Sequence, residues 1–102
     1  MRAESQGLTV SGTLSPTAPG VNILTFRLEY DGAPVTPEQV GVEVRLPEEN
    51  LGPFTAEPEF DESAGEYTAS VAMPVAGEWR MQVTARIDTY TEPIAIIPIT
   101  IG

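Results

Sequence analysis

Apolar and polar residues alternate along most of this chain, which is the pattern of β-strands that are buried on one face. The clearest case is Gly65–Met73, whose apolar phase holds Tyr67, Ala69, Val71 and Met73. After turn residues at Pro74–Gly77, the alternation resumes with Trp79, Met81 and Val83. The pattern predicts two half-buried strands joined by a tight turn.

Further segments of the same kind predict the remaining strands: Leu8–Leu14, Val21–Tyr30, Val40–Leu46, Thr55–Phe60 and Ile94–Ile101. Pro58 makes the Thr55–Phe60 strand short or an edge element, because proline cannot donate to a ladder. For the same reason, Pro98 places the last strand at a sheet edge or directs its missing N–H away from the ladder. Thr36–Gln39 has the pattern of one short helical turn. Strands at this spacing, without an amphipathic helix, predict an all-β, immunoglobulin-like Greek-key β-sandwich of seven to eight strands.

The inward phases of these strands predict the core: Phe26, Leu28, Val42, Val44, Tyr67, Val71, Trp79 and Val83. A chain of 102 residues is long enough for one such core. We therefore expect a single β-sandwich domain over residues 8–102. The polar residues 1–7 lack a strand pattern and are expected to form a disordered N-terminal tail. They also lack the apolar region of a signal peptide.

The charge balance excludes several classes of partner. Fifteen acidic residues against five arginines give a net charge of −10, which argues against nucleic acid and against direct binding to an anionic lipid surface. The chain has no His, Cys or Lys, so the usual bases and nucleophiles of enzymes are missing and only a carboxylate could act as a base. We therefore expect no enzymatic activity.

Metal binding has two weak groups of candidate ligands. Glu48 and Glu49 lie on a loop and offer oxygen ligands without the spacing of a calcium loop. Met73 and Met81 offer the thioether ligands that copper(I) favours, but both fall on the inward phase of their strands, where core packing is the alternative. Without His and Cys, a structural zinc site is excluded.

Three other side chains stand out from the strand pattern. Trp79 is the single Trp and is expected to anchor the core. Asn22 falls on an apolar phase and is expected to bond backbone groups of a neighbouring loop. Tyr90, in the Asp88–Pro93 loop, is either part of an interaction site or a plug over one end of the core.

Several turn and core motifs, taken in order, resemble one family. They are Pro19–Asn22, Asp31–Val35, Leu46-Pro47, Leu51–Pro53, Gly65–Tyr67 and Gly77–Val83. This series resembles the YtkA-like domain, and more closely the exoplasmic domain at the C-terminal end of CopD-type bacterial copper-transport membrane proteins. The resemblance covers Leu8–Ile101.

The resemblance implies an immunoglobulin-like sandwich outside the cytoplasmic membrane, in the periplasm or at the cell surface, tethered to a membrane-embedded transporter domain. Its implied partners are that transporter domain or a periplasmic protein. Copper-binding CopC domains use His ligands and some YtkA-like relatives carry Met and His in a loop, whereas this chain has no His and its loop reads Pro47–Pro53 without Met. The implied copper association therefore belongs to the parent protein.

From these observations we expect a non-catalytic accessory domain of a copper-transport or copper-resistance protein that works as an interaction module. Two alternatives stay open. One is a metal-chaperoning domain that binds copper through Met73 and Met81 together with loop carboxylates. The other is a generic structural module of a cell surface.

Overall fold

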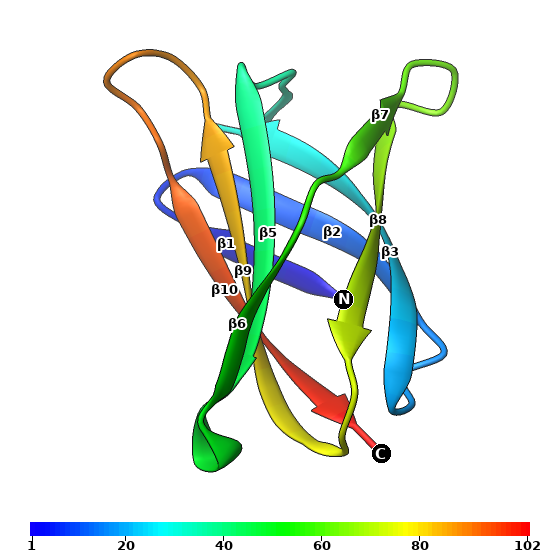
Figure 1. Cartoon of the computed structure of the whole chain (residues 1–102). Coiled ribbons are helices and arrows are strands. Elements are labelled where there is room, and N and C mark those ends of the chain that lie inside the picture. The colour runs from blue at the N-terminus through cyan, green and yellow to red at the C-terminus, as the bar shows by residue number, and fades with distance from the viewer.

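The computed structural model describes residues 1–102 and is built almost entirely of antiparallel strands in two sheets (Figure 1). The six-stranded sheet has the order β1-β2-β3-β8-β7, with β4 paired to β3. Its strands are β1 (Arg2–Ser5), β2 (Leu8–Ser15), β3 (Gly20–Tyr30), β4 (Ala33–Pro34), β7 (Glu59–Asp61) and β8 (Glu66–Met73). The four-stranded sheet has the order β10-β9-β5-β6 and contains β5 (Gln39–Leu46), β6 (Leu51–Ala56), β9 (Gly77–Arg86) and β10 (Ile94–Ile101).

This strand order confirms the predicted immunoglobulin-like sandwich. The strands β2, β3, β8 and β7 take the places of A, B, E and D in such a domain, and β10, β9, β5 and β6 take those of G, F, C and C′. Seven strands have six or more residues, and the three short ones, β1, β4 and β7, bring the total to ten instead of the seven to eight expected. As Pro98 predicted, β10 lies at a sheet edge.

The core lies between the sheets, where the inward phases of both meet. All eight predicted core residues are buried, with Trp79 1% exposed and Phe26 fully buried. Phe26 stacks on Tyr67 with ring centroids 5.3 Å apart, and Phe54 lies 6.1 Å from the Trp79 ring. The alternation along each strand therefore predicted the core correctly. Residues of one phase face the opposite sheet and are shielded from water.

The N-terminal residues differ from the prediction. Residues 1–7 were expected to be a disordered tail, but Arg2–Ser5 forms β1 and pairs antiparallel with β2. The pairing buries part of Ala3 against the core, and a tight turn at Gln6-Gly7, where both residues have positive φ, joins the two strands. Four residues with a single small apolar side chain are too few for a recognisable alternation, so only the pairing with β2 makes them a strand.

Two shorter predictions also need correction. Thr36–Gln39 contains no helical turn, and Gln39 already belongs to β5. The only helical segment is the 3-10 turn η1 (Pro47–Glu49), which falls far short of the length and hydropathy of a membrane-spanning helix.

One segment of the chain belongs to both sheets. The predicted Thr55–Phe60 strand is divided at Glu57-Pro58, with β6 pairing with β5 in one sheet and β7 pairing with β8 in the other. Figure 1 shows this crossing, with β6 leaving β5 and continuing to β7 beside β8. The crossing positions the groove described next.

Candidate functional site

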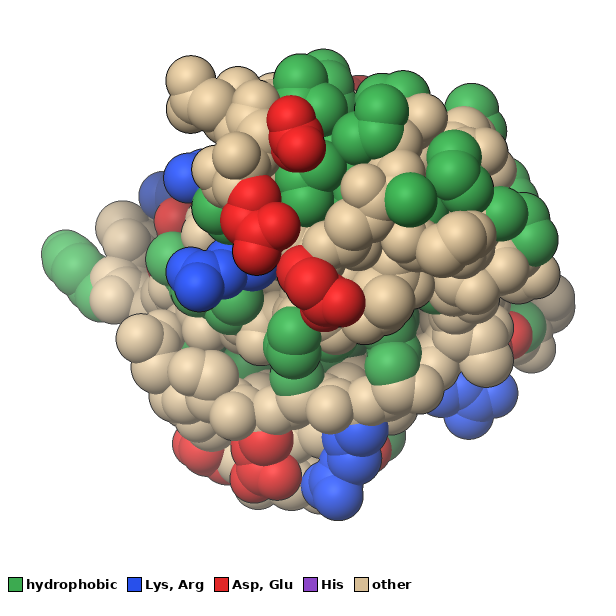
Figure 2. Space-filling view, turned by 90° about the horizontal axis from the view of Figure 1, so that it is seen from below, with side chains coloured by type: hydrophobic (Ala, Val, Ile, Leu, Met, Phe, Trp, Pro, Cys, Tyr) green, Lys and Arg blue, Asp and Glu red, His purple; other side chains and the backbone are tan.

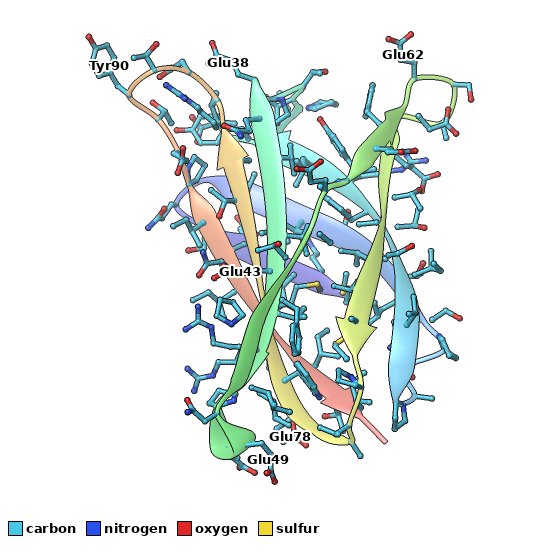
Figure 3. All side chains as sticks on the ribbon, viewed as in Figure 1. Glu38, Glu43, Glu49, Glu62, Glu78 and Tyr90 are labelled. Carbon is cyan, nitrogen blue, oxygen red and sulfur yellow. The ribbon has the colours of Figure 1, made fainter.

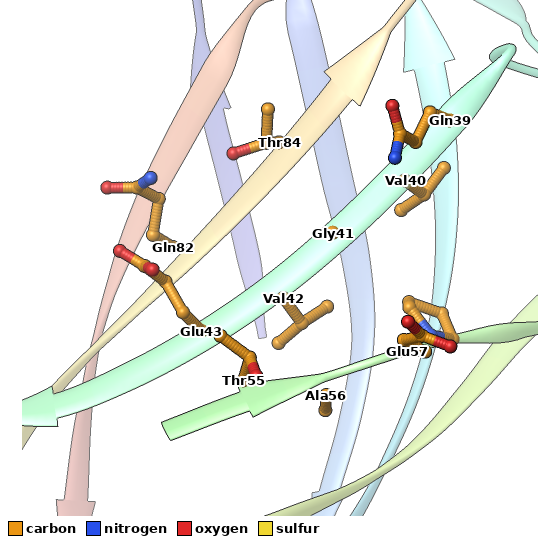
Figure 4. Close-up of a pocket in the computed structure, with 11 residues that line it drawn as sticks. Gln39, Val40, Gly41, Val42, Glu43, Thr55, Ala56, Glu57, Gln82 and Thr84 are labelled. Carbon is orange, nitrogen blue, oxygen red and sulfur yellow. The ribbon is translucent and has the colours of Figure 1, made fainter. Parts of the chain in front are cut away.

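A groove of about 500 Å³ lies on the outward face of the four-stranded sheet, where β6 departs from β5 (Figure 4). Its polar lining comes from β5, β9 and the β6–β7 crossing: Gln39, Glu43, Thr55, Glu57, Gln82 and Thr84. Val40, Gly41, Val42, Ala56 and Pro58 also line it. A smaller adjoining hollow of about 220 Å³ extends over Gly41 to Arg86 and Glu92, toward the β9–β10 loop.

Two local features open this groove. The register between β5 and β6 ends at Val42 opposite Ala56, after which the chain crosses to the other sheet at Glu57-Pro58. Gly41 then contributes no side chain to the outward face, and a Cβ at this position would meet no atom within 4 Å. The groove therefore lies where β5 has no neighbouring strand on one side and, at Gly41, no side chain on its outward face.

The lining of the groove is part polar and part apolar, and it carries two carboxylates. Figure 4 shows the Glu43 side chain directed toward Gln82, with Glu57 on the opposite side of Gly41. An Nη atom of Arg45 lies 3.0 Å from a Glu43 carboxylate oxygen, whereas Glu57 forms no ion pair. Such a lining can accept hydrogen bonds and hold a cation, and it offers no nucleophile paired with a base.

Tyr90 lies on the loop between β9 and β10 and its side chain is 96% exposed. The loop itself is fixed by hydrogen bonds: the Tyr90 N–H donates to Asp88 Oδ1 at 2.8 Å, and the Ile87 N–H donates to the Thr91 carbonyl at 2.8 Å. Figure 3 shows Tyr90 at the same end of the molecule as Glu38 and Glu62. Because its ring covers nothing, the interpretation of Tyr90 as a core plug is wrong.

The candidate metal ligands are not brought together. Met73 and Met81 are fully buried, one in each sheet, and face the core between them. Glu48 and Glu49 are exposed on η1, and Figure 3 shows Glu49 at the end of the molecule opposite Tyr90. No group of three or more acidic side chains is arranged to hold a metal ion.

Asp61, at the end of β7, uses its carboxylate to hold the turn that follows. Asp61 Oδ1 accepts hydrogen bonds from the Ser63 hydroxyl at 2.6 Å and from the Ser63 N–H at 3.0 Å. These bonds, the hydroxyl first, lower the pKa of Asp61 below its usual 3.8. The carboxylate therefore closes the turn between β7 and β8.

Asn22 and Trp79 have the structural roles predicted for them. Asn22 is fully buried, accepts the Thr17 N–H at 2.6 Å through Oδ1 and donates through Nδ2 to the Ala18 carbonyl at 3.0 Å. Trp79 donates through Nε1 to the Val75 carbonyl at 2.9 Å. Both side chains form hydrogen bonds with backbone groups of loops at the ends of strands, so their polar atoms are not free to bind a ligand.

Charged and apolar side chains are unevenly distributed over the surface of the molecule. Figure 2, a view from below, shows apolar and uncharged atoms over a broad area, with acidic and basic side chains gathered in smaller groups. The arginines with ion pairs are Arg2, Arg27, Arg45 and Arg86, each within 4.0 Å of a glutamate. Because these pairs lie at the surface, each contributes little to stability.

The sequence singled out Tyr90, which is exposed and whose part in an interaction stays a prediction, but gave no indication of the groove. The available signals were Gly41 on the outward phase of a strong strand and Pro58 inside a weak one. Neither shows by itself that the two positions lie across from each other, because that depends on the pairing of β5 with β6.

Comparison with known families completes the description of the site. No curated protein and no solved structure gave a match. The family model described as YtkA-like matches residues 2–84, which include β1 through most of β9 and the polar lining of the groove, while the Tyr90 loop follows the matched region. Since the match extends over well more than half of its length, the chain belongs to the YtkA-like family.

Proposed function

We propose that this chain is a non-catalytic extracytoplasmic accessory domain of a copper-transport or copper-resistance membrane protein, and that it acts by binding another protein. The partner is the membrane-embedded transporter domain or a periplasmic protein. The observation that carries the proposal is Tyr90, an aromatic side chain 96% exposed on a loop that is otherwise held by hydrogen bonds.

An exposed tyrosine on a fixed loop suits a protein interface. Tyrosine is enriched among the residues that dominate binding energy, because a large ring is buried at a small cost in side-chain entropy. The hydrogen bonds of Asp88 and Thr91 already order the backbone, so little further entropy is lost on binding. Loops at the end of a sandwich are also a common place for binding residues.

The connection with copper rests on the resemblance of the sequence to CopD-type exoplasmic domains, within the broader YtkA-like family to which the chain belongs. A direct role in carrying copper is less well supported. The thioethers of Met73 and Met81 have no exposed surface, and a chaperone must present its ligands to the protein that receives the metal. A docking role needs only the exposed surface around Tyr90.

The location is tested with a single introduced cysteine. The chain has no cysteine, so Glu49→Cys, an exposed position at the end of the molecule opposite Tyr90, creates a unique label in this domain, away from the proposed interface, when the whole gene is expressed in its host. We expect a membrane-impermeant maleimide to label intact cells at this site. Labelling that occurs only after lysis would contradict an extracytoplasmic location.

The binding role is tested by replacing Tyr90 with a photo-crosslinking phenylalanine analogue and, separately, with serine. We expect a crosslink to the transporter domain or a periplasmic protein, and a lower copper tolerance or copper uptake in the Tyr90→Ser strain. Ile96→Ser is the matched control, because Ile96 is 57% exposed on β10 outside this loop. No crosslink, together with unchanged copper handling in Tyr90→Ser, would overturn the proposal.

A further inference from the structure

We propose that the open edge of β5 at Gln39–Gly41 binds an extended peptide segment carrying a basic side chain, which adds to the four-stranded sheet as a short strand. This inference rests on the proposed function, because it names the kind of partner segment that an interaction module of this shape would bind. Three independent features of the groove support it.

The first feature is a backbone position on β5 that faces the groove. The N–H groups of Ala85 and Ile87 donate to the carbonyls of Pro93 and Thr91, on the side of β10. Bonding alternates along an antiparallel ladder, so Thr84 and Arg86 bond toward β5. Their register partners there are Gly41 and Gln39.

Val40 lies between those two partners, and the same alternation directs its N–H and C=O to the opposite edge of β5. Continuing the β5–β6 register by two residues beyond Val42 and Ala56 would place Pro58 across from Val40. Proline has no N–H, and the chain has crossed toward β7 at this point. The groove of about 500 Å³ occupies the place of the missing strand.

The second feature is the space above Gly41. An added strand needs room for the side chains that point to the outward face, and a Cβ on Gly41 would have no neighbour within 4 Å. The side chains of Gln39 and Thr84 border this space with hydrogen-bonding groups. Main-chain pairing with pockets for alternate side chains is the usual mode of β-strand addition.

The third feature is the charge of the groove. Glu57 lines it and has no ion-pair partner, and the nearby Arg86 is already 3.8 Å from a carboxylate oxygen of Glu38. In a chain with a net charge of −10, this favours a Lys or Arg side chain over an acidic one. The occupant is therefore a basic extended segment.

The test uses the purified chain, labelled with ¹⁵N, and an acetylated, amidated pentapeptide of sequence Thr-Arg-Val-Arg-Thr. We expect saturable NMR shifts centred on the amides of Val40, Gly41 and Glu57, and at least 10-fold slower hydrogen exchange of the Val40 amide at saturation. The peptide Thr-Glu-Val-Glu-Thr is the charge control and should bind at least 10-fold more weakly. Shifts confined to other surfaces, or none at millimolar peptide, would overturn the inference.

Two variants locate the site. Gly41→Val fills the groove with a strand-forming residue and should weaken peptide binding at least 10-fold, whereas Thr13→Val, an exposed position on β2 of the other sheet, should leave it unchanged. Glu57→Gln, on the exposed crossing, should reduce the preference for the arginine peptide over the glutamate peptide several-fold even if Gly41→Val folds poorly. Unchanged preference in Glu57→Gln would contradict the charge argument.

The outcomes separate this inference from the proposed function. If Tyr90 gives no crosslink and the Tyr90→Ser strain handles copper normally, the proposed function is rejected, whether or not the peptide binds. A peptide that fails to bind, with Tyr90 effects intact, would reject only the β5 edge as the place where the partner is held.

Discussion

Gly12 and Gly41 both lie inside strands, but the same change to alanine should have opposite effects at the two positions. At Gly12 on β2, an added Cβ would lie 2.7 Å from Phe26 Cα and would overlap the Thr25 carbonyl oxygen. Both obstructing atoms belong to the backbone of β3, which is held between β2 and β8. At Gly41, the added Cβ would lie in open space.

The magnitudes follow from what has to move. Replacing an unstrained glycine with alanine stabilises a protein by about 0.4–1 kcal/mol, mainly through the unfolded chain, which is the expected gain for Gly41→Ala. Gly12→Ala must push β2 away from β3 and break ladder hydrogen bonds, each of which leaves buried groups unpaired at about 1–3 kcal/mol. Breaking two such bonds, less the gain from the unfolded chain, should lower the free energy of unfolding by about 3 kcal/mol. This is a large part of the stability of a small domain.

Urea unfolding followed by tryptophan fluorescence measures both effects, since Trp79 is the single Trp and is buried. The two variants should differ by about 3–4 kcal/mol in the free energy of unfolding, with Gly41→Ala above the parent chain. If Gly12→Ala lost less than about 1 kcal/mol, the close approach of β2 and β3 would not constrain the fold as described.

Three further changes test the core, one loop and the pH dependence. Trp79→Ala should cost about 3–5 kcal/mol by circular dichroism, because it empties the centre of the core and frees the Val75 carbonyl. Asn22→Ala should cost about 2 kcal/mol, because the Thr17 N–H loses its partner; a cost below about 0.5 kcal/mol would show that water replaces the amide. Burial raises the pKa of Tyr67 above 10.0, so the unfolded chain loses this proton first and stability should fall as pH rises above 10.0. Tyr67→Phe should flatten that fall in urea midpoints between about pH 9 and 12, and an unchanged slope would contradict the assignment.

Much of the fold could be predicted because each long strand buries only one face. Period-two alternation places Trp79, Val71 and Val44 in the core without any knowledge of their neighbours, and all three are buried. The turn residues between strands then limit the topology. The prediction was weaker wherever a strand depends on its partner instead of its own pattern, as in Arg2–Ser5, which is a strand because it pairs with β2.

In the candidate site, too, local features could be predicted from the sequence and features that depend on strand pairing could not. Tyr90 could be identified because an aromatic residue between Asp88 and Pro93 lies in a loop, and only the structure shows that its ring covers no part of the core. The groove depends on where β6 stops pairing with β5, which is a contact between residues that are far apart in sequence. The alternation within β5 does not show where its pairing with β6 ends.

The crossing at Glu57-Pro58 also bears on self-association. Unpaired strand edges are the places where copies of a β-protein join and aggregate. The edge opened on β5 covers Gln39–Gly41, a length of about 10 Å at the usual rise per strand residue, and Pro58 lies beside it. Such an opening offers any occupant only the few hydrogen bonds of Val40. A basic segment gains in addition from Glu57, whereas a second copy with a net charge of −10 does not. The same crossing that exposes a binding edge therefore keeps it too short to initiate aggregation.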